Sequence, residues 1–184
     1  MFMLILTVGV LIWAYSHLMK RFTPGVRARL GDKGGKMVVS LLSFLAIGLM
    51  IVGYRSADVI VLWSPPASLL HVNNLLMLLA VWLLNLGQVR GVLRTRMRHP
   101  MLTGVILWAV AHLMVNGDLA SVILFGGILV WAVVDMVMIN RMQREWVPPA
   151  AGPVKNDVIY AGIAVLLFGA IAYAHNWLGY WPFG

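Results

Sequence analysis

The residues of this sequence that could do chemistry are five histidines, and each lies within or at the edge of a long apolar stretch. They are His17, His71, His99, His112 and His175. A charged side chain at the centre of a membrane costs roughly 2.5–3.5 kcal/mol on insertion scales, so polar groups there usually pair or serve a site. Because neutral imidazole is a common ligand of metals and of haem iron, the placement favours a histidine-ligated cofactor.

The stretch 98–118 holds the densest set of polar groups. It opens with Arg98, His99 and Pro100, carries His112 near its far end, and closes on Asn116, Gly117 and Asp118. On a helix, His99 and His112 point about 140° apart, so they cannot bind one ion together. His112 and Asn116 are four residues apart and share a face. Each histidine therefore needs a partner from another helix.

Most of these positions also have a simple structural interpretation. His99 can start a helix, with Pro100 at its first position. Asp118 can cap the following helix. His71 follows a proline turn and can cap or anchor a helix, and His175 lies among aromatic residues typical of a membrane interface. His17 and His112 are harder to explain in this way, because each lies within apolar sequence.

The absence of cysteine narrows the cofactor chemistry. Without thiols the chain has no disulfides, no thiolate metal ligands and no cysteine-held iron–sulfur cluster. Covalent c-type attachment of haem, which needs cysteine, is excluded for the same reason. Histidine, carboxylate and methionine remain as ligands.

The elements that must position these groups are membrane-spanning helices. The chain is 61% hydrophobic and 11% charged, whereas soluble domains carry about 25% charged residues. This composition predicts an all-α, polytopic transmembrane bundle forming a single domain over residues 1–184. Residues 58–70 contain two adjacent prolines and are expected to form a loop, partly embedded around 59–63. Six spans are predicted, over residues 2–19, 37–54, 69–86, 101–115, 119–139 and 158–177.

The basic residues predict the orientation. The net charge is +8, but the charges lie between apolar spans, which argues against nucleic-acid binding. With six spans, 13 of the 14 basic residues fall on one side and only Arg55 on the other. The positive-inside rule then places the basic loops in the cytoplasm and both termini outside. The first apolar run lacks a basic leader and a cleavage site, so we expect it to remain as a span.

These motifs resemble the NnrU family of membrane proteins. The resemblance rests on Arg98-His99-Pro100, on Ala111-His112-Leu113 and on Asn116-Gly117-Asp118, and it runs over nearly the whole chain. It also includes Ser16-His17-Leu18 at the end of the first helix, followed by Arg27-Ala28-Arg29-Leu30-Gly31. His71 opens the third predicted span and His175 closes the sixth.

The resemblance implies a function in the bacterial inner membrane linked to denitrification and nitric oxide metabolism. NnrU proteins are similar to zeta-carotene isomerases, which hold b-type haem between two histidines and isomerise a polyene. Carried over by position, those ligands fall on His17 and His112. Their depths along the membrane normal would differ by about 14 Å, so pairing His112 with His71 or His175 stays open. This chain has no clear counterpart to the isomerases' longer second loop.

Two other functions remain open from the sequence, and it does not decide whether the protein is an enzyme. The chain could be a non-catalytic assembly factor that binds a respiratory complex and uses its histidines only for packing. It could also be a membrane methyltransferase, because Arg-His-Pro occurs in enzymes that bind S-adenosylmethionine. The stretch 141–149 has one acidic residue and no tyrosine, which argues against the methyltransferase. The expected partners are the lipid bilayer and either a lipid-soluble substrate or a respiratory protein.

Overall fold

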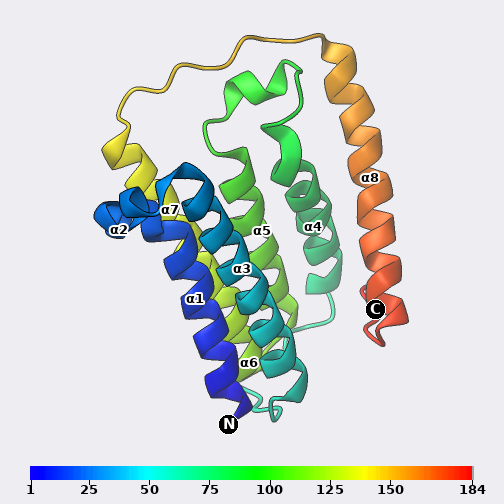
Figure 1. The fold of residues 1–184 in the computed structure, drawn as a ribbon. Coiled ribbons are helices and arrows are strands. Elements are labelled where there is room, and N and C mark those ends of the chain that lie inside the picture. Colours follow the sequence, from blue (N-terminus) through cyan, green and yellow to red (C-terminus); the bar gives the residue numbers. More distant parts are fainter. Residues whose placement is uncertain (184) are drawn as a thin grey trace. The chain divides into compact units, whose positions relative to one another are not determined.

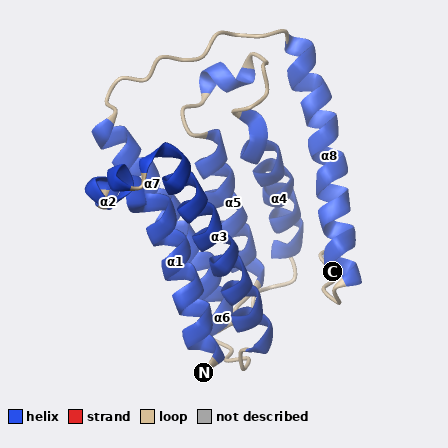
Figure 2. Cartoon of the chain, in the orientation of Figure 1, coloured by secondary structure: helices blue, strands red, loops and turns tan. Residues whose placement is uncertain are grey.

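Helices make up most of the computed structural model, which describes residues 1–183 (Figure 2). Loops join them, and no strand is assigned within this described part of the chain. The helical prediction is therefore confirmed. The elements, labelled in Figure 1, are α1 (Phe2–Phe22), α2 (Pro24–Arg29), α3 (Gly31–Ser56), α4 (Leu69–Leu86), η1 (Leu93–Arg96), α5 (Pro100–Val115), α6 (Leu119–Ser121), the π-helical turn η2 (Val122–Gly126), α7 (Gly127–Met142) and α8 (Val154–Trp177).

Five helical segments are long and apolar enough to cross a membrane. They are α1, α3, α4, the run Leu119–Met142 and α8. A sixth, α5, is apolar but has only 16 residues, which is short of the roughly 20 that a span needs. Each segment overlaps one of the six predicted spans, and the chain is an integral membrane protein. The placement of the termini outside stays a prediction.

Two helices begin earlier than predicted, because their polar first turns are helical too. The third element begins at Gly31 rather than at residue 37, and its first turn holds Asp32. The last helix begins at Val154 rather than at residue 158, with Asp157 in its first turn. An acidic residue near a helix N-terminus interacts favourably with the helix dipole. Apolar patterning locates the part of a helix that lies in lipid, and the helix itself continues into the interface.

The chain divides into two compact units that interleave along the sequence. The first unit comprises Met1–Ser64 and Gly117–Trp131, and the second comprises Pro65–Asn116 and Ala132–Gly184. The helical run Leu119–Met142 therefore contributes residues to both units. The single domain over residues 1–184 stays a prediction.

Close packing of α1 against α3 forms the first unit. A Cβ atom built on Gly53 would lie 2.5 Å from the backbone nitrogen of Leu6, and one built on Gly9 would lie 3.0 Å from the carbonyl oxygen of Ala46. Leu6 and Ala46 are completely buried at this contact. Small residues let membrane helices approach closely, which is how they associate without a hydrophobic driving force.

A short backbone pairing lies in the first unit directly after α3. Val61 and Asp118 form an isolated antiparallel bridge. The Leu62 and Trp63 amides both donate to the Gly117 carbonyl, at 2.7 and 3.1 Å. Residues 58–64 are thus non-helical, as predicted, and Val59 is 81% exposed. Such an apolar surface suits lipid, although partial embedding of this loop stays a prediction.

In the second unit, α4 packs against α5 and α8. A Cβ atom built on Gly104 of α5 would lie 3.0 Å from the carbonyl oxygen of Ala80 in α4. Tyr160 of α8 joins Leu83 and Leu86 of α4 in a buried cluster. This packing holds α8, which is otherwise largely exposed.

Candidate functional site

His17 lies in a small aromatic cluster of the first unit. Its ring stacks on Trp13, with centroids 4.1 Å apart, and meets the edge of Trp131 at 5.1 Å. Its Nδ1 atom lies 2.9 Å from the carbonyl oxygen of Trp13. A carbonyl oxygen can only accept, so Nδ1 carries the proton, and in the neutral ring Nε2 carries the lone pair. Ligating histidines are commonly oriented by such a bond from the other ring nitrogen.

The two tryptophans beside His17 carry buried donors that nothing accepts. Their rings meet edge to face at 5.6 Å, and neither indole nitrogen has a hydrogen-bond partner among residues 1–183. Trp131 is only 5% exposed. Leaving a buried donor unpaired costs about 1–3 kcal/mol, and such exceptions in native proteins call for an explanation, such as an unseen group. The cluster therefore has the character of a ligand site.

His112 has the same local geometry in the second unit. Its Nδ1 atom lies 2.8 Å from the carbonyl oxygen of Trp108, and the two rings are 4.9 Å apart. Because that carbonyl oxygen can only accept, Nδ1 carries the proton and Nε2 of the neutral ring carries the lone pair. The side-chain amide of Asn116 donates to the backbone carbonyl of His112 at 2.8 Å. Asn116 thus closes the end of α5.

A repeated local motif accounts for this likeness. His17 closes the segment Trp-Ala-Tyr-Ser-His, and His112 closes the segment Trp-Ala-Val-Ala-His. One helical turn separates each tryptophan from its histidine, which brings the two rings together on one face. His175 also bonds the carbonyl four residues before it, at 2.8 Å, but that residue is Ile171. Helical spacing predicts the contact of Trp108 with His112, and the Trp-Ala-x-x-His repeat is the signal that would have identified Trp13 as the neighbour of His17.

The remaining histidines have different surroundings. His99 precedes α5, with Pro100 at its first position as predicted, and its Nε2 lies 2.8 Å from Asn140 Oδ1. The Arg98 guanidinium donates to the carbonyl of Gln143. Arg98 and His99 are therefore engaged where α5 begins and α7 ends. His71 is exposed on α4, and His175 lies near the end of α8.

Asp118 caps the helical run that follows it, as predicted. One of its oxygens accepts from the Ser121 amide at 2.9 Å, and the other from the Ser121 hydroxyl at 2.6 Å. That hydroxyl also lies 2.9 Å from the hydroxyl of Tyr54. Ser121 is completely buried. The chain of bonds therefore ties the end of α3 to the start of α6 inside the first unit.

Replacing Asp118 with alanine is expected to lower the free energy of unfolding by about 1 kcal/mol, because the helix loses its cap. Thermal unfolding in detergent measures the change. Asp118→Asn is the matched control, because its amide oxygen can still accept from the Ser121 amide. A melting temperature that is the same for Asp118→Ala as for the unchanged protein contradicts the capping role.

The units separate the predicted site residues into two groups. His17 and Asp118 belong to the first unit, whereas His71, Arg98, His99, His112, Asn116 and His175 belong to the second. Within the described residues, no three histidine or acidic side chains gather as a metal ion would need. Two imidazoles suffice to hold haem iron, and the described chain offers neutral histidines for that role.

The comparisons with known proteins agree with the sequence motifs. The family model described as NnrU protein matches residues 5–182, which is nearly the whole chain. Neither the search of curated proteins nor the search of solved structures gave a match.

Proposed function

Because the chain belongs to the NnrU family, we propose that it binds b-type haem in the membrane, which His17 and His112 would hold. The observation that carries this proposal is the shared geometry of the two histidines. Each ring packs against a tryptophan one helical turn earlier and donates its Nδ1 proton to that residue's carbonyl. Both Nε2 atoms are thereby the lone-pair positions of neutral imidazoles, the form that ligates haem iron.

The residues around each histidine would tune it as a ligand. A hydrogen bond from the non-ligating nitrogen fixes the ring orientation and raises the basicity of the ligating one. Trp13 and Trp131 shield His17 on two sides with apolar rings. His112 and His175 both belong to the second unit, which supplies a second candidate pair.

The haem would supply one-electron redox chemistry at its iron. We propose that the protein uses it in nitric oxide metabolism or in the isomerisation of a lipid-soluble polyene. The NnrU family supports the first role, and the likeness of that family to zeta-carotene isomerases supports the second. In either role, the protein would supply the imidazoles and apolar surroundings that keep water away from them.

A visible absorption spectrum of the detergent-purified protein tests the proposal directly. The protein is produced in cells supplied with a haem precursor and recorded oxidised and then reduced with dithionite. We expect a Soret band and sharp reduced α and β bands, which are typical of a six-coordinate b-type haem. A featureless spectrum from well-folded protein, also after reconstitution with hemin, would refute haem binding and favour the assembly-factor alternative.

A further inference from the structure

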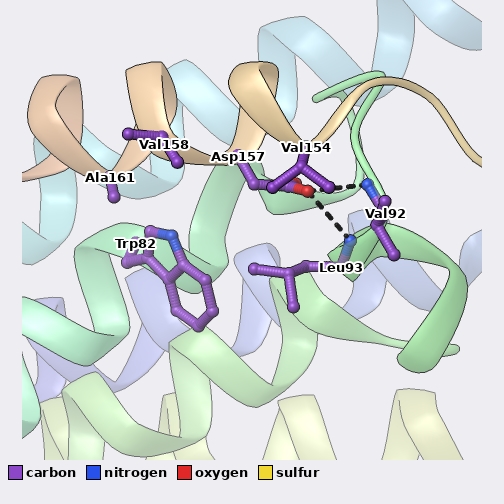
Figure 3. A pocket seen from close by; sticks show the side chains of 7 residues that line it. All are labelled: Trp82, Val92, Leu93, Val154, Asp157, Val158 and Ala161. Atoms are coloured by element: carbon purple, nitrogen blue, oxygen red, sulfur yellow. Dashed lines mark hydrogen bonds between the residues drawn. The ribbon is translucent and has the colours of Figure 1, made fainter.

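An apolar groove runs between α4 and α8 in the second unit, and the haem proposal makes no use of it. Two adjoining hollows, of about 370 and 290 Å³, form the groove and share Trp82 and Ala161. Figure 3 shows the hollow nearest the start of α8, with the Trp82 indole opposite Val158 and Ala161. On α8 the lining extends from Val154 to Val165.

The length and depth of the groove match one leaflet of a bilayer. The twelve residues from Val154 to Val165 are separated by eleven steps, which rise by about 16 Å along the helix. The hydrocarbon core of a bilayer is about 30 Å thick, so one leaflet provides about half of that. Because Val154 begins α8, the groove starts at the end of the helix that carries basic residues and extends toward mid-membrane.

The one acidic side chain that lines the described groove is turned away from it. Asp157 is 6% exposed, and its Oδ2 atom accepts from the backbone amides of Val92 and Leu93, at 2.7 and 3.3 Å (Figure 3). Its Oδ1 atom packs against Gly91, where an added Cβ atom would lie 1.9 Å from it. The carboxylate is thus occupied in holding the loop, and the groove presents an apolar surface.

The same contacts bring the basic loop 90–96 against the segment that leads into α8, where the Arg94 guanidinium donates to the Ala150 carbonyl at 3.2 Å. The Asn156 side chain donates to the Arg90 carbonyl at 2.8 Å, and the Gly152 amide donates to the Gly91 carbonyl at 3.0 Å. These bonds fasten the loop before η1 to the start of α8. Arg94 follows the lining residue Leu93, and Lys155 follows the lining residue Val154. Arg90, Arg96 and Lys155 are exposed.

We propose that this groove binds one anionic phospholipid, with an acyl chain between α4 and α8 and the phosphate beside Arg94 and Lys155. The apolar walls suit a hydrocarbon chain, and the basic mouth suits a negative headgroup. A basic side chain near a membrane surface strengthens the binding of anionic lipid by about fivefold. A zwitterionic lipid with the same acyl chains would fill the groove but would bind without this added electrostatic attraction.

Native mass spectrometry of the delipidated full-length protein tests the preference for an anionic headgroup. Phosphatidylglycerol and phosphatidylcholine with identical chains are titrated separately. We expect one phosphatidylglycerol per chain, bound at least about fivefold more tightly than phosphatidylcholine. Arg94→Gln combined with Lys155→Gln should remove the preference, whereas Arg144→Gln, an exposed residue of the loop before α8, should keep it. Equal binding of the two lipids to the unchanged protein overturns the proposal.

A substitution that fills the groove tests the position of the lipid's acyl chain. Ala161→Trp should reduce phosphatidylglycerol binding by at least tenfold, because the indole occupies the space shared by both hollows. Ala170→Trp is the control, because nine residues along α8 place it on the opposite face, and it is exposed. In the unchanged protein, phosphatidylglycerol with a photoreactive chain should label residues 78–82 and 158–165. Undiminished binding to a folded Ala161→Trp, or labelling only elsewhere, overturns the assignment.

Discussion

Substituting alanine for His112 is expected to remove the proposed haem from the purified protein. Losing the outer hydrogen-bond partner of a metal ligand costs about 10–100-fold in affinity, so losing the ligand itself is expected to cost more than about 100-fold. Trp108 would remain but has no lone pair to offer the iron. The measurement is the ratio of Soret to protein absorbance after purification, compared with that of the unchanged protein.

The companion variants identify the second ligand. His17→Ala should also lose haem if the proposed pair is right, and His175→Ala should keep it. Loss of haem from His175→Ala with retention by His17→Ala would instead assign the pair within the second unit. Loss of haem from His71→Ala, with retention by the other two variants, would instead assign the second ligand to this exposed histidine of α4. Full haem content in a folded His112→Ala variant would contradict all of these pairs.

Gly53→Ala is expected to destabilise the protein by at least about 1–3 kcal/mol, the usual cost of overpacking. The new Cβ atom would lie 2.5 Å from the backbone nitrogen and 2.7 Å from the Cα atom of Leu6. Backbone atoms cannot rotate away as a side chain can, so α1 and α3 must separate. The change is measured as the shift in the midpoint of thermal or denaturant unfolding in detergent.

Gly48→Ala provides the control on the same helix. A Cβ atom at that position would meet nothing within 4 Å, and alanine has the higher helix propensity. This variant should therefore unfold at the same midpoint or a higher one. Equal stability of Gly53→Ala and Gly48→Ala would contradict the close contact between α1 and α3. The comparison separates a steric effect from a general intolerance of glycine substitution.

The fold was largely predictable because its determinants are local. Apolar run length located every span, and the predicted 69–86 coincides with α4. Capping by Asp118 and the start of α5 at Pro100 were predictable too, since each depends on residues next to it in the sequence. Helix ends were less predictable. The polar turns at Gly31 and Val154 are helical without being apolar.

The surroundings of the histidines were predictable only in part. The contact between Trp108 and His112 follows from helical spacing, but the contact between His17 and Trp131 joins residues 114 positions apart. The bond between Tyr54 and Ser121 is similarly remote in sequence. The role of Asp157 could not be predicted from the sequence, because an acidic residue in a first helical turn is common. Its role depends on the tertiary contact with the loop at Val92.

The π-helical turn Val122–Gly126 changes the direction in which Trp131 points around the helix axis, relative to the direction of Ser121. A π turn inserts one residue into an α-helix, so the side chains after it are rotated by about 100° relative to an uninterrupted helix. Before the turn, Ser121 points to Tyr54, and after it, Trp131 points to His17. The inserted residue therefore lets one helical run present Ser121 to Tyr54 and Trp131 to His17. A single-residue deletion in that turn would leave the capped end aligned with α3 while swinging the indole away from the histidine.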